Sequence, residues 1–124
     1  MDFMEAAQTV GADLGTGGQQ HAPAGALFLA VLAWRELGDA DPVWDQVGLV
    51  LLDVQQRLYP EHNVGVEVQA PQDGPRTRAA VAALITRLAE HHHAMAADGT
   101  GALPARLDHD AAAQQLRHAA AVLT

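Results

Sequence analysis

The chain has 124 residues and a formal net charge of −8, because it contains 15 acidic and seven basic residues. It contains no Cys, Ser or Lys, which excludes a disulfide, a thiolate metal ligand, a Ser-His-Asp triad, a Schiff-base lysine and a P-loop lysine. The negative charge argues against binding to nucleic acid or to an anionic membrane surface, since both attract clustered basic residues.

The composition favours a helical protein that does not span a membrane. Hydrophobic residues make up 49% of the chain but aromatic residues only 4%, so Leu, Val and 26 alanines must build the core. Ala and Leu are strong helix formers. The longest apolar run, residues 24–34, is shorter than the roughly 20 residues that a membrane-spanning helix needs. The acidic start, MDFMEAAQTV, lacks the basic region of a signal peptide, and we expect a cytoplasmic protein.

Residues 1–20 are expected to form a short helix and a linker. Apolar side chains recur at helical spacing from Phe3 to Leu14, and the Gly-rich stretch of residues 15–25 then interrupts the pattern. We expect this segment either to be mobile or to dock on a neighbouring element. Residues 21–124 are expected to form a single helical domain.

The next two expected helices carry unusually large apolar surfaces. Residues 24–37 are apolar almost all the way round, and residues 42–59 place Leu49 and Leu52 away from their main apolar stripe. A domain of this size has room for about one fully enclosed helix. The excess predicts a homodimer, unless the first helix or the following loop covers it. The candidate interface residues are Leu27, Trp34, Leu49 and Leu52.

Residues 60–74 are expected to form an irregular loop. Pro60 ends the preceding helix, and residues 63–69 alternate Val with small or polar side chains, which is typical of an extended segment. This segment either fixes three valines on the helices or pairs with its copy across a dimer.

The C-terminal half predicts a long helix over residues 75–97, with Met95 on its apolar face, and a second helical region after it. Leu103 and Leu107 align with each other but not with Leu116 and Leu123. This change of phase predicts a short helical turn at 102–107 and a new helix that Asp108 caps. The fold class is therefore all-α, a four-helix bundle-like core with an extra short N-terminal helix.

Three consecutive histidines, residues 91–93, lie near the end of the long helix. Consecutive positions on a helix diverge, so the three rings do not ligate one metal together. His92 falls on the apolar face, and it approaches His109 if residues 75–97 and 109–123 form an antiparallel hairpin. A divalent metal held by N and O ligands is one interpretation, and one core imidazole bonded to a carbonyl, with two solvated rings, is the other. The candidate metal ligands are His92, His109, Asp108, Asp110 and His118.

Two arginines, Arg76 and Arg78, lie in the first turn of the same long helix, where the helix dipole favours negative charge. They therefore need an anionic partner. That partner is either an internal carboxylate such as Asp73, or a bound anion or partner protein. The turn upstream supplies His62 and Asn63 as further candidates for an anion- or partner-binding site.

One ion pair is expected within a single helix. Asp53 interrupts an apolar run, and Arg57 lies four residues further on, in the favoured order of an acid before a base. A role for Asp53 in metal binding or acid–base chemistry is the alternative.

Together these features favour a non-enzymatic, acidic helical module that binds a protein partner as a homodimer, in an accessory, regulatory or immunity-type role. Its acidity fits a basic partner. The alternative is a helical protein that binds a small ligand or a divalent metal, or an acid/base enzyme that uses His92, His109 and a nearby Asp. A third interpretation is an anion sensor built around Arg76 and Arg78.

Overall fold

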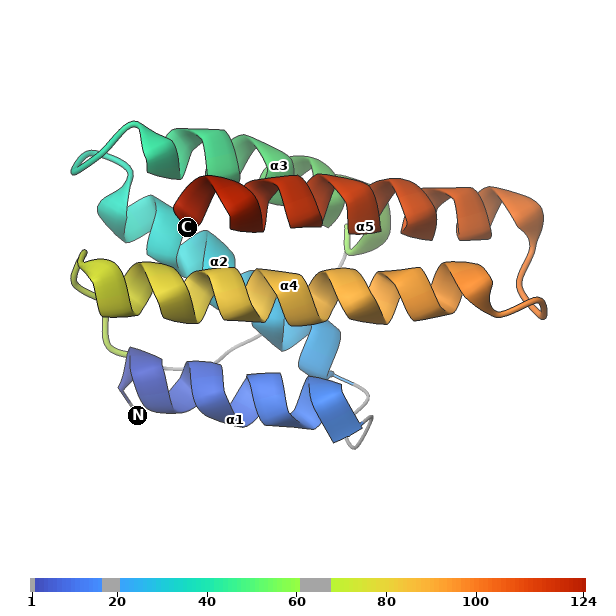
Figure 1. The fold of residues 1–124 in the computed structure, drawn as a ribbon, viewed down its shortest axis with the longest axis horizontal. Coiled ribbons are helices and arrows are strands. Elements are labelled where there is room, and N and C mark those ends of the chain that lie inside the picture. The colour runs from blue at the N-terminus through green and yellow to red at the C-terminus, as the bar shows by residue number, and fades with distance from the viewer. Residues whose placement is uncertain (1, 17–20, 61–67) are drawn as a thin grey trace.

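The computed structural model describes residues 2–16, 21–60 and 68–124, and its secondary structure over these ranges is entirely helical. Five helices pack against one another in a bundle-like arrangement (Figure 1), which confirms the predicted all-α fold class. Their bounds are α1 Phe3–Thr16, α2 Ala22–Leu37, α3 Val43–Leu58, α4 Pro75–Ala97 and α5 Leu103–Leu123.

The centre of the bundle is formed by α2 and α4. Helix α4 contacts α1, α2 and α5, and α2 contacts α1, α3 and α4. The core that the five helices share is mainly aliphatic, as the composition requires, and it includes many alanines. The largest fully buried side chains include Trp44, Leu51, Leu84, Ile85, Leu88 and Leu116.

Helix α1 belongs to the same core as the other helices. Phe3, Ala6 and Ala7 are buried, and the helix packs on both α2 and α4. The spacing of these residues places them on one face, which is the pattern of a helix docked along one side. The predicted Gly-rich linker at residues 15–25 is too long, because α1 runs to Thr16 and α2 begins at Ala22. Residues 17–20 between them lie outside the described part of the chain.

Most apolar side chains of α2 and α3 are covered within one chain. Leu27 is only 2% exposed, so it is a core residue and the prediction that it lies at a dimer interface is wrong. Trp34 and Leu52 are half-buried, and the Trp34 ring lies directly against Gly48 of α3. Leu49 alone among the four candidate interface residues is exposed, at 67%. Residues 24–58 therefore leave less apolar surface uncovered than the sequence predicts, and Leu49 is the one large apolar side chain in this range that is exposed.

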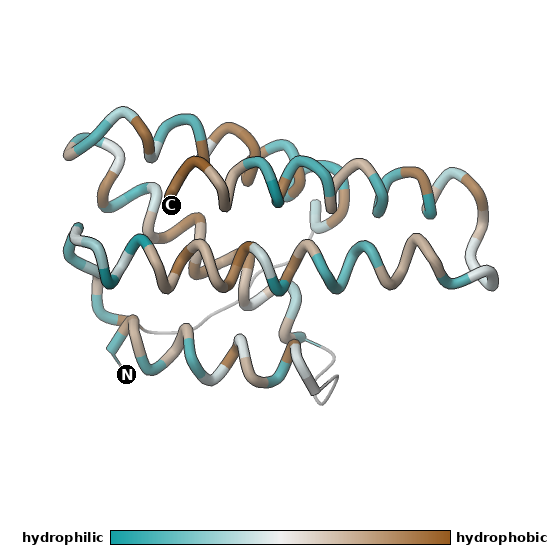
Figure 2. The backbone as a smooth tube through the Cα atoms, viewed as in Figure 1, coloured by the Kyte–Doolittle hydropathy of each residue, from teal (hydrophilic) through white to brown (hydrophobic). Residues whose placement is uncertain are grey.

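Helices α4 and α5 form an antiparallel hairpin whose far end projects beyond the other three helices (Figure 1). Helix α5 is continuous from Leu103, so the predicted break at residue 108 is wrong. The change of phase has another cause, since Leu103 and Leu107 face solvent whereas Leu116 and Leu123 face the core. Met95 is exposed too, which corrects its predicted burial. Figure 2 shows apolar positions continuing into this projecting end.

The predicted loop at 60–74 is only partly described, because residues 61–67, including His62 and Asn63, lie outside the described ranges. The described residues that follow, 68–73, are neither helix nor strand. None of the helices seen here has the length and apolarity that crossing a bilayer requires. The cytoplasmic location expected from the sequence stays a prediction.

Candidate functional site

A chain of three aromatic side chains links α4 with α5 and with the end of α3. Nε2 of His92 lies 2.9 Å from the Tyr59 hydroxyl, and Nδ1 of His92 lies 2.8 Å from Nδ1 of His109. The rings of His92 and His109 stack with their centroids 5.0 Å apart. The predicted approach of His92 to His109 is therefore confirmed, although the buried ring bonds to two side chains rather than to a carbonyl.

Burial determines the charge state of this chain. His92 is 1% exposed, and desolvation, together with the neighbouring His91 and His109, lowers its pKa from 6.5 to about 3. Burial also raises the pKa of Tyr59 above its ordinary value. At neutral pH, both His92 and Tyr59 are therefore uncharged.

Two proton arrangements satisfy both hydrogen bonds. In the first, Tyr59 donates to Nε2 of His92, whose Nδ1–H donates to Nδ1 of His109. In the second, Nδ1–H of His109 donates to His92, whose Nε2–H donates to the Tyr59 oxygen. Conversion between them moves protons along the chain, so the arrangement can relay a proton between two half-buried ends. The core itself offers a substrate no access to His92.

The remaining candidate metal ligands are not gathered around this pair. Asp110 accepts a hydrogen bond from Gln114, and His118 is exposed two to three turns further along α5 than His109. Over residues 2–16, 21–60 and 68–124, no group of three or more His, Cys, Asp or Glu side chains is placed to hold a metal ion. The predicted metal set is therefore not assembled. His91 is half-buried and His93 exposed.

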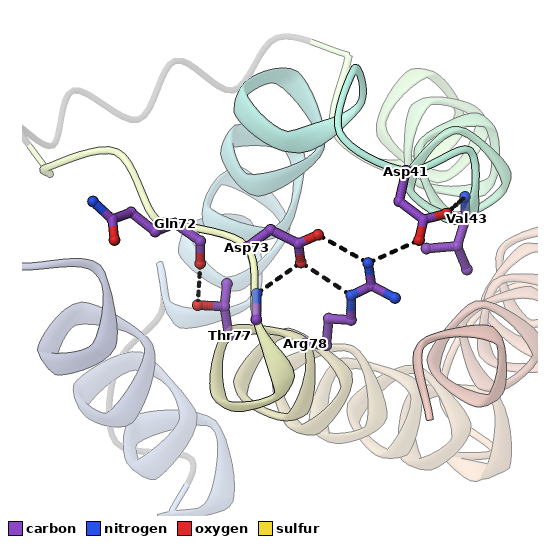
Figure 3. A network of polar contacts seen from close by, with 7 residues as sticks. Asp41, Val43, Gln72, Asp73, Thr77 and Arg78 are labelled. Atoms are coloured by element: carbon purple, nitrogen blue, oxygen red, sulfur yellow. Dashed lines mark hydrogen bonds and ion pairs between the residues drawn. The ribbon is translucent and has the colours of Figure 1, made fainter.

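The start of α4 is tied to the α2–α3 turn through Arg78 (Figure 3). Its guanidinium donates twice to Asp73, from Nε at 3.0 Å and from Nη2 at 2.8 Å, and Nη2 also donates to Asp41 at 3.0 Å. Asp41 in turn accepts from the backbone N–H of Val43, so it fixes the first turn of α3 as well.

These contacts decide between the two interpretations of Arg78. A hydrogen bond from the Val43 backbone, followed by one from Arg78, holds the pKa of Asp41 below its usual range. Arg78 itself is the first cause of the lowered pKa of Asp73. One cation faces two carboxylates, so the cluster carries a formal charge of about −1 and repels a further anion. Arg78 is therefore an internal ion-pairing residue.

Arg76 lies apart from this cluster. It is exposed, it belongs to none of the ion pairs in the described ranges, and it lines a groove between α1 and α4. The structure thus separates the two arginines that the sequence grouped together.

The ion pair expected within α3 is present. Nη2 of Arg57 lies 3.0 Å from Oδ2 of Asp53, and the same oxygen accepts a hydrogen bond from Gln115 of α5 at 2.9 Å. Asp53 therefore has a structural role that joins α3 to α5.

An exposed face that the sequence did not predict lies at the start of α5. It is formed by Leu103, Leu107 and Asp110. These residues follow at intervals of four and three, so they share one side of the helix. Leu103 is 64% exposed and Leu107 59% exposed, although apolar side chains of this size are usually covered. We call these three residues the leucine face. The change of helical phase was the sequence signal that could have identified it.

Sequence reasoning also missed two other residues. The third member of the histidine chain is Tyr59, whose position at the end of α3 gives no local hint of a partner 33 residues away. The second cation of the α1–α4 groove is Arg87, and its spacing of 11 residues from Arg76 is a signal that could have been read.

No protein-family model, curated protein or solved structure matches this chain.

Proposed function

We propose that this protein is an interaction module that binds a basic protein partner through the leucine face of α5. The observation that carries the proposal is the pair of exposed leucines, Leu103 and Leu107, one helical turn apart at the projecting end of the α4–α5 hairpin. Exposed apolar side chains that lie together are typical of surfaces that another molecule covers.

Charge complementarity supports a basic partner. Asp110 continues the leucine face by one turn, Asp108 lies beside it, and Asp98 precedes it in the hairpin turn. The one nearby arginine, Arg106, turns its guanidinium toward the backbone oxygen of Ala96 at 3.1 Å. The partner expected here inserts apolar side chains between the leucines and brings Lys or Arg against the acids, which also speeds association.

The test compares affinity purification by the wild-type chain and by the double variant Leu103→Glu/Leu107→Glu. A partner that is basic, that the wild type retains and that the variant loses supports the proposal, and its retention should fall as salt concentration rises. The matched control is Ala105→Glu/Ala121→Glu, which adds the same charge to exposed positions of the same helix. Equal recovery by the wild type and both variants contradicts the proposal.

We also propose that two copies of the chain associate through α3. Leu49, exposed at 67%, is the observation that supports it, with Leu52 half-buried on the same helix. The homodimer expected from the sequence would then be formed around Leu49, with Leu27 excluded because it is buried.

The alternative expected from the sequence, a ligand or metal protein using His92 and His109, is favoured by one observation, the 2.8 Å contact between their Nδ1 atoms. Two nitrogen ligands leave a metal without the usual three or four protein ligands. Elemental analysis of untagged protein tests this alternative, because near-stoichiometric zinc, iron or nickel would favour it over the interaction module.

A further inference from the structure

A groove of about 490 Å³ runs between α1 and α4, which lie side by side in Figure 1. Its floor is made of small or apolar side chains, among them Ala7 and Gly11 from α1 and Ala80 and Ala83 from α4. Two arginines, Arg76 and Arg87, also line it, and none of the acidic residues in the ranges 2–16, 21–60 and 68–124 does. The volume lies within the range of small-molecule sites.

The lining of the groove on α4 is a regular pattern. Arg76, Ala80, Ala83 and Arg87 follow at intervals of four, three and four residues, so they form one stripe along the helix. Eleven residues separate the arginines, which places their Cα atoms roughly 16 Å apart at 1.5 Å per residue. A positive charge thus stands at each end of an apolar floor.

Within the described residues, no ion pair involves Arg76 or Arg87. The ion pairs found in the described ranges involve Arg57 and Arg78 only, although the chain has 15 acidic residues. Two cations that have no carboxylate partner in the described part of the chain leave a local positive potential, which attracts an anion to this groove rather than to the rest of the surface.

Arg87 is held in position by the glycines of α1. Its Nη1 donates to the backbone oxygen of Gly11 at 3.2 Å, and a Cβ at Gly15 would stand 2.7 Å from the same Nη1. Glycine at position 15 therefore allows the guanidinium of Arg87 to lie against α1, beside the groove that this residue lines.

We propose that this groove binds an elongated small molecule with an apolar chain and a carboxylate at each end. The chain lies on the alanine and glycine floor, and the two carboxylates pair with Arg76 and Arg87. This groove is a different surface from the leucine face, because the residues that line it belong to α1 and α4.

Dodecanedioate is the probe for this site, used with the intact chain in calorimetric titration and thermal unfolding. It should bind and raise the melting temperature, since a ligand of the folded state stabilises it. Dodecanoate should bind more weakly, and dodecanol should show no dependence on either arginine. Because exposed ion pairs are weak, Arg76→Gln and Arg87→Gln should each reduce the affinity for dodecanedioate by about fivefold.

Two further variants separate a site from a general charge effect. Arg117→Gln removes the same charge from an exposed position on α5 and should leave the affinity unchanged. Ala83→Leu fills the floor at an exposed position without changing charge, and it should abolish binding.

Three results would overturn the proposal. The first is no binding of dodecanedioate by the wild type, and the second is an equal loss of affinity in Arg117→Gln and Arg87→Gln. The third is unchanged affinity in Ala83→Leu. A fall in molecular mass in Ala83→Leu, with no effect of dodecanedioate on the wild type, would assign the groove to a second copy of the chain instead.

Discussion

Nδ1 of His92 on α4 lies 2.8 Å from Nδ1 of His109 on α5. Two neutral imidazoles can share this contact only if one donates and the other accepts, and protonation of both would place two cations against each other. The pair therefore couples the packing of the hairpin to its protonation.

This coupling predicts a pH-dependent stability. The pKa of His92 falls from 6.5 to about 3 on folding, so between these values the unfolded chain binds a proton that the folded chain does not. The free energy of unfolding should thus be highest above about pH 6.5 and fall as pH decreases, with a slope from His92 that approaches 1.4 kcal/mol per pH unit. Urea denaturation at pH 7, 6 and 5 measures it.

Glutamine at position 92 keeps a hydrogen-bonding side chain but does not titrate. His92→Gln should therefore show a shallower slope than the wild type, while His93→Gln, which changes an exposed ring, should keep the wild-type slope. The pKa of His91 is also lowered by burial, so part of the slope remains in both variants. Parallel curves for His92→Gln and the wild type would contradict the prediction.

The Arg78 cluster predicts an order of coupling energies. Arg78→Gln should lower the melting temperature, because Asp73 and Asp41 would then face each other without a cation. In double-mutant cycles, the coupling of Arg78 with Asp73 should exceed its coupling with Asp41, since Asp73 accepts two of its hydrogen bonds and Asp41 one. High salt should weaken both couplings.

The control for this cluster is Arg76→Gln, two residues away and outside the ion pairs. It should leave the melting temperature close to that of the wild type. A similar loss in both single variants would show that the effect belongs to the charge at this helix end and not to the ion pairs of Arg78.

The close contact of Trp34 with Gly48 predicts the effect of one added methyl group. A Cβ at position 48 would overlap the Trp34 ring, so Gly48→Ala must displace the indole and break its hydrogen bond to Asp45. We expect a loss of about 1–3 kcal/mol in the free energy of unfolding, the usual cost of overpacking. Urea denaturation with tryptophan fluorescence measures the loss and the movement of the ring.

Gly25→Ala is the matched control, because position 25 is also helical but its Cβ would make only an ordinary contact with Val10 at 3.7 Å. Alanine should stabilise the helix there by about 0.5–1 kcal/mol. Stabilisation by both substitutions would mean that Trp34 does not occupy the space beside Gly48.

Association through α3 predicts the behaviour of Leu49→Glu. Light scattering should give the wild type twice the mass of one 13.1 kDa chain and the variant a single-chain mass, because a charge at the centre of an apolar interface is left without a partner. The variant should remain folded, since the side chain is exposed. A single-chain mass for the wild type would remove the dimer from the proposal.

Some features of the fold can be predicted from local signals in the sequence. The positions of α1 to α4 follow from apolar periodicity and from breaks such as Pro60 and Gly99, and the burial of His92 follows from its place on an apolar stripe. The pair of Asp53 and Arg57 follows from a spacing of four residues. Each of these depends on geometry within one helix, which the sequence specifies directly.

The contacts between helices could not be predicted from the sequence and are known only from the tertiary structure. The bond from Tyr59 to His92, the separation of Arg78 from Arg76, and the burial of Leu27 depend on which helix faces which. Periodicity identifies the apolar side of a helix, but it does not show over what length a neighbouring helix covers that side. Leu103 and Leu107 are exposed for this reason, because they lie on α5 where the hairpin extends past the rest of the bundle.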